Sequence, residues 1–338
     1  MTSSWRGAAR LIAGAFGAFT NGLTSSMPAG TKADKNVDML IGGQAVIEGV
    51  MMRSLTGYSV AVRQPDGGVS IRKDKLVSIA AKYPFLKVPV LRGSVVLIQS
   101  LILGMRALNY SASVASEGED GQPEMSNWAI ASSMLMALVL GVGLFILAPL
   151  GLTNLLRHYV FPDMGNFAYN AIDGAIRAIF FFVYIASISM MDEIRRVFQY
   201  HGAEHKTVYT FEANEDLTVE NARTKSTLHP RCGTSFLMFV MAISILVFSL
   251  IPSAAPFAVK FGARVVLIPL IAGLAYEVIR FSARHLTNPV CKMLIRPGLW
   301  LQRITTKEPD DQQLEIALIA LKEALLYDII EPEQAAVA

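Results

Sequence analysis

DEIRRVFQYHGAEHKTVYTFEANEDLTVENARTKSTLHPRCG (192–233) is a hydrophilic stretch that lies between two strongly apolar runs of the chain. It contains three of the five histidines, and His201, Glu204 and His205 form the pattern H-x-x-E-H. On a helix, residues four apart lie about 40° apart around the axis, so both imidazoles would face one way. Glu204 would lie on the neighbouring flank, within reach of a metal-bound water. This inverted zinc pattern predicts a metal site.

The rest of the chain is too apolar for an ordinary soluble domain. Of its 338 residues, 53% are hydrophobic and only 17% are charged. This composition predicts a membrane protein whose first partner is the lipid bilayer. The sequence has no arginine-rich tract or aromatic platform, so a nucleic-acid partner is not expected. The two cysteines, Cys232 and Cys291, fall in segments that we expect in the reducing cytosol, which argues against a disulfide framework.

Four apolar segments predict transmembrane helices within residues 128–281. They cover residues 128–150, 171–191, 234–259 and 263–281. The segments outside the predicted spans alternate between many and few Lys and Arg residues. These residues are frequent in residues 1–127, in the 192–233 loop and in residues 280–338, but sparse in residues 151–170. The positive-inside rule then places both termini and the 192–233 loop in the cytosol. We therefore predict a polytopic α-helical protein of the inner (cytoplasmic) membrane with N-in, C-in topology.

The residues before the first predicted span divide into three parts. Residues 1–37 are expected to be a weakly ordered leader, and residues 38–89 a small β-containing cytosolic region with a hairpin turn at PDGG (65–68). Residues 90–127 are expected to form an apolar helix, Leu91–Leu108, followed by a loop from Ser111 to Asn127. Arg92 and Arg106 interrupt this helix at a spacing too short for a bilayer, which predicts an interfacial or re-entrant helix.

Residues 282–338 are predicted to lie on the cytosolic side. An interfacial segment, His285 to Thr306, precedes an amphipathic helix over Gln312–Leu325. Asp310 and Gln313 have the spacing of a capping box at the start of this helix. Two acidic residues fall within the predicted spans: Asp173 is placed to pair with Arg177 along one helix face, and Glu277 is expected at the interface beside Arg280 and Arg284.

A catalytic zinc site normally has three protein ligands and one open position, so the two helical histidines need a third ligand. His229 and Cys232 are the leading candidates, and Glu48, Glu212 and His285 are further alternatives. Bound Zn²⁺ would lower the pKa of a water molecule, and Glu204 would accept its proton as the catalytic residue. Arg231 or Lys206 could stabilise a developing oxyanion or hold a phosphate. Glu48 is either an acid with a structural partner or a metal ligand or general base, and Gln44, a hydrogen-bonded strand residue, is named in support.

Three functions are consistent with these patterns. The first is a metal-dependent hydrolase acting at the cytosolic membrane surface. The second is a non-catalytic scaffold or assembly factor that binds a membrane-protein partner, with a structural metal or none; a closed site of His201, His205, His229 and Cys232 would favour it. The third is a small carrier or channel, but the spans show no internal repeat to support it.

Five segments of the chain carry a resemblance to a known family. They are IGGQAVIEGVMMRS (41–54), VLRGSVVLIQSLILGMRALNYSA (90–112), HGAEHKTVYTFE (201–212), LHPRCGTSFL (228–237) and PGLWLQRITTKEPDDQQLEIA (297–317). Together they resemble the YqhQ-like family of bacterial membrane proteins, and the resemblance extends over about residues 38–328. The family is a domain of unknown function whose members are commonly labelled predicted metal-dependent enzymes. The resemblance implies metal positions at His201, His205 and His229, with Glu204, Cys232 and Glu48 in support.

Overall fold

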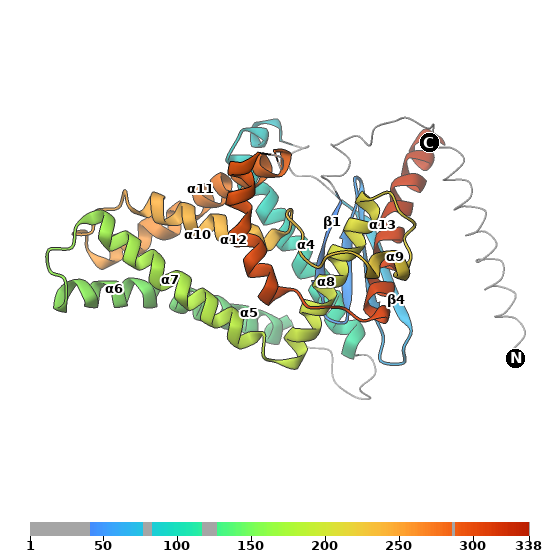
Figure 1. Cartoon of the computed structure of the whole chain (residues 1–338), viewed down its shortest axis with the longest axis horizontal. Helices are drawn as coiled ribbons and strands as arrows, with labels where there is room; N and C mark the ends of the chain where they lie inside the picture. The colour runs from blue at the N-terminus through green and yellow to red at the C-terminus, as the bar shows by residue number, and fades with distance from the viewer. Residues whose placement is uncertain (1–40, 77–82, 117–126, 286–287, 338) are drawn as a thin grey trace, which may run out of the picture. The chain divides into compact units, whose positions relative to one another are not determined.

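Four antiparallel strands follow one another at the start of the described chain and form a single sheet in the order β1-β2-β3-β4 (Figure 1). PDGG forms the turn between β3 and β4, where Gly67 adopts a φ of 88° that favours glycine. The predicted β-containing region is therefore confirmed. The strands are β1 (Gly42–Val46), β2 (Gly49–Arg53), β3 (Gly57–Arg63) and β4 (Val69–Lys75).

The computed structural model describes residues 41–76, 83–116, 127–285 and 288–337. The expected leader, residues 1–37, and most of the expected loop before Asn127 lie outside the described residues. The helices after the sheet are a 3₁₀ turn η1 (Pro84–Lys87), α4 (Leu91–Ser116), α5 (Asn127–Val142), a π-helical segment η2 (Gly143–Leu147), α6 (Ala148–Tyr159), α7 (Asn166–Ile188), α8 (Asp192–Glu212), α9 (Val219–Arg223), α10 (Gly233–Phe248), α11 (Phe257–Arg284), α12 (Pro289–Thr305) and α13 (Asp311–Val337).

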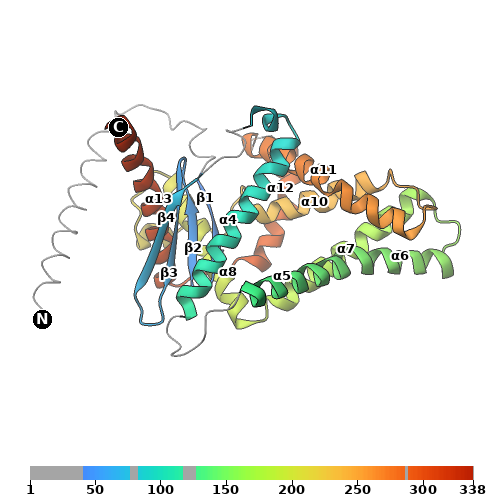
Figure 2. The ribbon, with the colours of Figure 1, turned by 180° about the vertical axis from the view of Figure 1, so that it is seen from behind.

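Helices cover both faces of the sheet. Successive side chains along each strand point to opposite faces, so each strand contributes residues to both. On one face, Val50 and Met52 pack against α8 and α13 in a core that includes Tyr200 and Leu321. On the other face, Met51 and its neighbours pack against the C-terminal half of α4. Figure 2 shows α4 crossing this second face of the sheet. The sheet thus fixes the position of α8, which carries the histidines.

The C-terminal helix begins as predicted. The Gln313 N–H donates to Asp310 Oδ1 at 2.8 Å, and the Asp310 N–H donates to Gln313 Oε1 at 2.9 Å, which is a reciprocal capping box. Leu314, Leu318 and Leu321 are buried against the sheet and α8. The amphipathic helix is therefore confirmed, and it extends beyond the predicted Leu325 to Val337.

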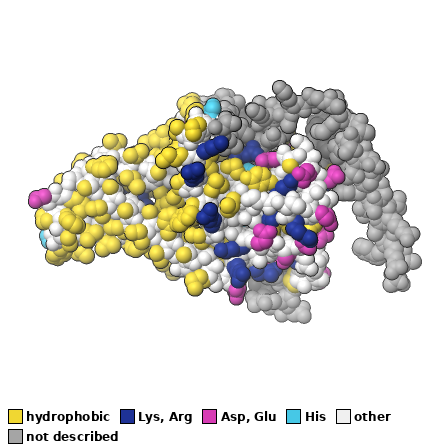
Figure 3. All heavy atoms as spheres, in the orientation of Figure 1, with side chains coloured by type: hydrophobic (Ala, Val, Ile, Leu, Met, Phe, Trp, Pro, Cys, Tyr) yellow, Lys and Arg dark blue, Asp and Glu magenta, His cyan; other side chains and the backbone are white. Residues whose placement is uncertain are grey.

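Among the described residues, four helical segments are long and apolar enough to cross a membrane. Figure 3 shows hydrophobic side chains gathered over the helices α6, α7, α10 and α11, whereas charged side chains lie over α12 and the elements around the sheet. Exposed apolar side chains in such numbers are expected on a surface that contacts lipid. The four segments are Leu91–Ser116, Ala131–Tyr159, Asn166–Ile188 and Phe257–Ser282.

The number of candidate spans agrees with the sequence, but two assignments differ. The predicted span over residues 234–259 is too long: α10 has only 16 residues and ends at Phe248, because Pro252 and Pro256 follow and cannot continue a hydrogen-bonded helix. The helix beginning at Leu91 was predicted to be interfacial or re-entrant, but it continues to Ser116, where a loop was expected, and is therefore long enough to be a candidate span. Its extra turns are stabilised by packing on the sheet, which the sequence pattern does not show.

The helix is interrupted between α7 and α8. The histidine-bearing helix could have continued directly from the second predicted span, but α7 ends at Ile188 and Met191 is extended, with φ −78° and ψ 134°. The helix α8 then restarts with Asp192 and Glu193 in its first turn, where acidic side chains favour the positive end of the helix dipole.

The acidic residues on the candidate spans, Asp173 and Glu277, are paired with arginines. Arg177 donates to Asp173 at 2.9 Å as predicted, and Arg264 of α11 also donates to the Asp173 carboxylate, at 2.8 Å. Glu277, expected beside Arg280 and Arg284, instead forms a two-point ion pair with Arg92 of α4. This contact joins α4 to α11, two helices far apart in the sequence.

Candidate metal centre

Three side chains that can ligate a metal meet beside the sheet: His201 and His205 on α8, and Cys232 at the start of α10. One ligand atom from each lies within 4.8 Å of the other two. Ligands of a tetrahedral Zn²⁺, with bonds of about 2.0–2.3 Å, are separated by roughly 3.3–3.7 Å. The three side chains therefore need to shift by only about an ångström to hold such an ion, and we call them the His₂Cys trio.

The backbone fixes the orientation of both imidazoles. His201 Nδ1 lies 2.8 Å from the carbonyl oxygen of Thr305, and His205 Nδ1 lies 2.5 Å from that of Thr227. A carbonyl accepts only from an N–H, so each ring carries its proton on Nδ1 and presents the lone pair of Nε2. Metal-ligating histidines characteristically donate their second N–H to such an acceptor.

Both Nε2 atoms are available on the side of Cys232. His201 Nε2 lies 3.2 Å from Cys232 Sγ, and His205 Nε2 is buried without a hydrogen-bond partner among the described residues. Burial lowers the pKa of His205, and this outweighs the opposing effect of Cys232. A neutral imidazole with an unused, buried lone pair is costly unless it has a ligand. The donor set therefore fits a metal ion.

Cys232 is positioned by the end of the loop that precedes α10. It is the N-cap residue of α10, and its sulfur accepts from the N–H of Thr234 at 3.4 Å. A helix N-terminus favours a negative charge, which suits a thiolate ligand. The side chain is 8% exposed.

His229 lies next to the trio but faces another partner. Its ring centroid is 5.6 Å from that of His205, and its Nε2 is 3.4 Å from Glu212 Oε2. His229 Nδ1 accepts from the N–H of Arg231 at 3.3 Å, which leaves the ring proton on Nε2 for Glu212. Burial lowers the pKa of His229 to about 4. The structure therefore places His229 adjacent to the trio rather than within it.

Glu204 connects the trio to the sheet. Its carboxylate accepts from the N–H of Gly43 in β1 at 3.1 Å, and the side chain is 7% exposed. Burial raises the pKa of Glu204, and this outweighs the opposing effects of His201, His229 and the Gly43 N–H. A proton-accepting group is thus held beside the histidines by a rigid strand.

The supporting residues named from the sequence have partners outside the trio. Glu48 pairs with Arg196 and tethers the β1–β2 turn to α8. The Gln44 amide packs against Gly104 of α4. Lys206 pairs with Glu308 at 2.6 Å, and Arg231 pairs with Glu212.

Sequence reasoning missed the residues that hold the site from α12. Buried Gln302 accepts from the His229 N–H at 2.8 Å and donates to the His229 carbonyl oxygen at 2.9 Å, which fixes the loop leading to Cys232. Thr227 and Thr305 contribute only backbone carbonyls, and a sequence pattern cannot predict such contacts because every residue type has a carbonyl. Gln302 and Thr305 fall within the segment 297–317 that carries the family resemblance, and this was the available signal.

The close approach of α8 to the chain after α12 provides a test of this geometry. A Cβ atom on Gly202 would lie 2.1 Å from the carbonyl oxygen of Lys307, two residues beyond Thr305. The variant Gly202→Ala should therefore displace Thr305 from His201, lower stability by about 1–3 kcal/mol and weaken metal binding by about 10- to 100-fold. Thermal unfolding and metal titration of the purified protein would measure both effects.

Gly262 in α11 is the matched control, because a Cβ there meets nothing within 4 Å. Gly262→Ala should leave metal binding unchanged and raise stability slightly, since alanine favours a helix. Equal metal affinity in Gly202→Ala and the wild type would contradict the role of the Thr305 carbonyl.

Two comparisons with known proteins match most of the chain. The family model described as a protein of unknown function, DUF1385, matches residues 88–326, which include the whole His₂Cys trio. The chain is 36% identical over 309 residues to the uncharacterized protein YqhQ of Bacillus subtilis (strain 168), covering 86% of this chain and 94% of that protein. No solved structure matches the chain.

The family match extends from α4 into the first part of α13 and thus includes the candidate spans as well as the site. Neither description names a metal or a reaction, so the site has to be argued from its own residues. The resemblance inferred from the sequence is confirmed, and the chain belongs to the YqhQ-like DUF1385 family of proteins of unknown function.

Proposed function

We propose that this membrane protein binds a divalent metal ion, Zn²⁺ above others, through His201 Nε2, His205 Nε2 and Cys232 Sγ, and uses it in a hydrolytic reaction at the cytosolic membrane surface. The observation that supports this most strongly is the pair of Nδ1–H donations to backbone carbonyls, which turn both lone pairs towards one thiol. Imidazole and thiolate are the ligands that zinc prefers.

Three ligands favour a catalytic over a structural site. Structural zinc is saturated by four protein ligands, whereas catalytic zinc keeps one position for water or substrate and lowers the pKa of that water. The trio offers three ligands among the described residues, since His229 donates towards Glu212 instead. Glu204, held by Gly43, is the candidate proton acceptor, and burial of the surrounding side chains keeps bulk water away from it.

The cytosolic location follows from the distribution of Lys and Arg, and it places the trio next to the membrane surface. A lipid or a membrane-protein segment is then the substrate class that could reach the site. The inner membrane and the N-in, C-in topology are part of the same proposal.

A scaffold with a structural metal is the second candidate, and the position of His229 is the observation that favours it. Its ring lies close enough to His205 that rotation away from Glu212 would supply a fourth ligand and close the site. X-ray absorption of the zinc-loaded protein separates the two candidates. Two nitrogens, one sulfur and one oxygen support the enzyme, whereas three nitrogens and one sulfur support the scaffold.

The two cysteines provide a test of the ligand set. Cobalt(II)-loaded protein should show a sulfur-to-metal charge-transfer band in the near ultraviolet, which Cys232→Ser should abolish. Metal affinity should fall by at least about 100-fold, since even substitutions of residues that only hold the ligands cost 10- to 100-fold. Cys291→Ser is the matched control, because Cys291 is also buried but lies on α12 outside the trio. A charge-transfer band that persists in Cys232→Ser would remove this residue from the site.

A further inference from the structure

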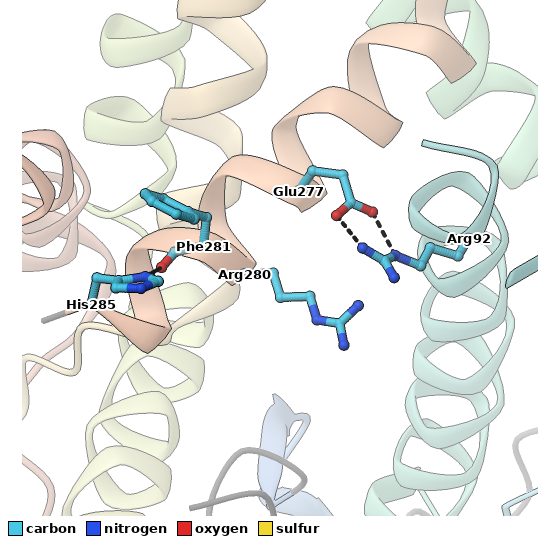
Figure 4. A pocket seen from close by; sticks show the side chains of 5 residues that line it. All are labelled: Arg92, Glu277, Arg280, Phe281 and His285. Atoms are coloured by element: carbon cyan, nitrogen blue, oxygen red, sulfur yellow. Dashed lines mark hydrogen bonds and ion pairs between the residues drawn. The ribbon is translucent and has the colours of Figure 1, made fainter. Parts of the chain in front are cut away.

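A second site lies away from the metal centre, at the end of two candidate spans. A cavity of about 270 Å³ lies beside the contact between the first turn of α4 and the last turns of α11. Figure 4 shows that its side chains come from both helices and from the residue that ends α11. They are Arg92, Glu277, Arg280, Phe281 and His285.

The cavity carries one more positive than negative charge. Arg92 uses Nε and Nη2 for its two contacts to Glu277, which leaves Nη1 for another acceptor. Arg280 lies one helical turn after Glu277, and Figure 4 shows its guanidinium extending into the space beside Arg92 without a dashed contact. Within the described parts of the chain, no hydrogen bond or ion pair engages Arg280. Two guanidinium groups facing one carboxylate form a site for an anion.

His285 does not add a donor in its neutral form. Its Nδ1 lies 2.9 Å from the carbonyl oxygen of Phe281, so the ring proton is used there and Nε2 presents a lone pair. Arg280 and the free Nη1 of Arg92 are therefore the groups that would hold the anion.

The segments that lead into the cavity are apolar and exposed. Phe281 is 59% exposed, and Leu91 at the start of α4 is 50% exposed. Phe85 in η1 and Val290 at the start of α12 are 66% and 63% exposed. Cationic side chains framed by apolar ones, at the ends of helices long enough to cross a bilayer, match the headgroup level of a membrane.

We propose that this cavity binds a phosphate-type oxyanion, held by Arg280 and by Nη1 of Arg92. The phosphodiester of an anionic phospholipid supplies this chemistry in the bilayer, with its acyl chains against the exposed apolar side chains, and a soluble phosphate supplies the same chemistry from the cytosol. The inference does not depend on the metal centre, which shares none of these residues.

Native mass spectrometry of the detergent-purified protein tests the proposal. The probes are phosphatidylglycerol, phosphatidylcholine and inorganic phosphate, the last also used as a competitor of the lipid. One phosphatidylglycerol should bind more tightly than phosphatidylcholine, because the latter carries a compensating positive charge. Arg280→Gln should weaken this binding about tenfold or more, since it removes a charge-assisted donor. Full competition by millimolar phosphate would identify the soluble anion as the occupant.

Three further variants separate recognition from misfolding. Arg280→Lys keeps the charge and should retain part of the affinity, and Glu277→Gln removes the opposing carboxylate and should bind as tightly as the wild type or more tightly. Arg303→Gln removes an exposed arginine of α12 outside the cavity and should behave as the wild type. Unchanged binding of every probe in Arg280→Gln, or an equal loss in Glu277→Gln and Arg280→Gln, would overturn the proposal.

Discussion

The metal content of the purified protein should fall from about one ion per chain to none when His201 and His205 are both replaced by alanine. The two imidazoles supply two of three ligands, and the single remaining thiolate of Cys232 cannot hold a divalent ion at micromolar concentration. Mass spectrometric metal analysis after purification without chelators measures this directly. The folded protein should persist, because the sheet, α8 and α13 share a hydrophobic core that does not involve the trio.

Two variants serve as controls for the loss of metal. His158→Ala/His285→Ala removes two exposed histidines outside the trio and should retain the ion. Glu204→Gln should also retain it, because the amide oxygen of glutamine can still accept the N–H of Gly43, while any hydrolytic turnover is lost. Wild-type protein without metal, or metal retained at full occupancy in the double histidine variant, would disprove the site.

Replacing Asp173 by alanine should destabilise the protein by about 3–5 kcal/mol, because it removes the anion from a buried cluster of cations. The side chains of Asp173 and Arg264 are each 2% exposed, and Arg177 is 14% exposed. Both guanidinium groups donate to the Asp173 carboxylate and also lie over the ring of Phe248. Without the carboxylate, two positive charges would stay buried with no counter-charge.

Unfolding of the detergent-solubilised protein, followed by circular dichroism, measures this loss. Asp173→Asn keeps the shape and part of the hydrogen bonding, so its stability should lie between those of Asp173→Ala and the wild type. Asp163→Ala, at an exposed position between α6 and α7, should change stability by no more than about 0.5 kcal/mol. A similarly small effect of Asp173→Ala would show that the cluster is hydrated and that its charges are not buried.

Local sequence patterns predicted the secondary structure where the chain interacts with itself at short range. The turn at PDGG gave the hairpin of β3 and β4, and the spacing of Asp310 and Gln313 gave the start of α13. Each depends on hydrogen bonds between residues a few positions apart, so the sequence contains the whole interaction. The same reasoning erred for the span over residues 234–259, where total hydrophobicity concealed the helix-ending effect of Pro252 and Pro256.

Contacts between distant segments could not be predicted in this way. The partner of Glu277 is Arg92, which lies 185 positions away, and the expected partners lay on the same helix. The C-terminal half of α4 continues as a helix because it packs on the sheet. Such contacts depend on how elements are arranged in space, and periodicity along one element carries no information about them.

The sequence by itself determined that the chain is an apolar helical membrane protein of the YqhQ-like family, with two histidines four apart on one helix face. Only the tertiary structure showed which side chains lie beside these histidines. It placed Cys232 at His201 and turned His229 to Glu212, and it fixed both imidazoles through the carbonyls of Thr227 and Thr305. The physical reason is that a ligand set is defined by the direction of lone pairs, and backbone groups brought together by folding set that direction.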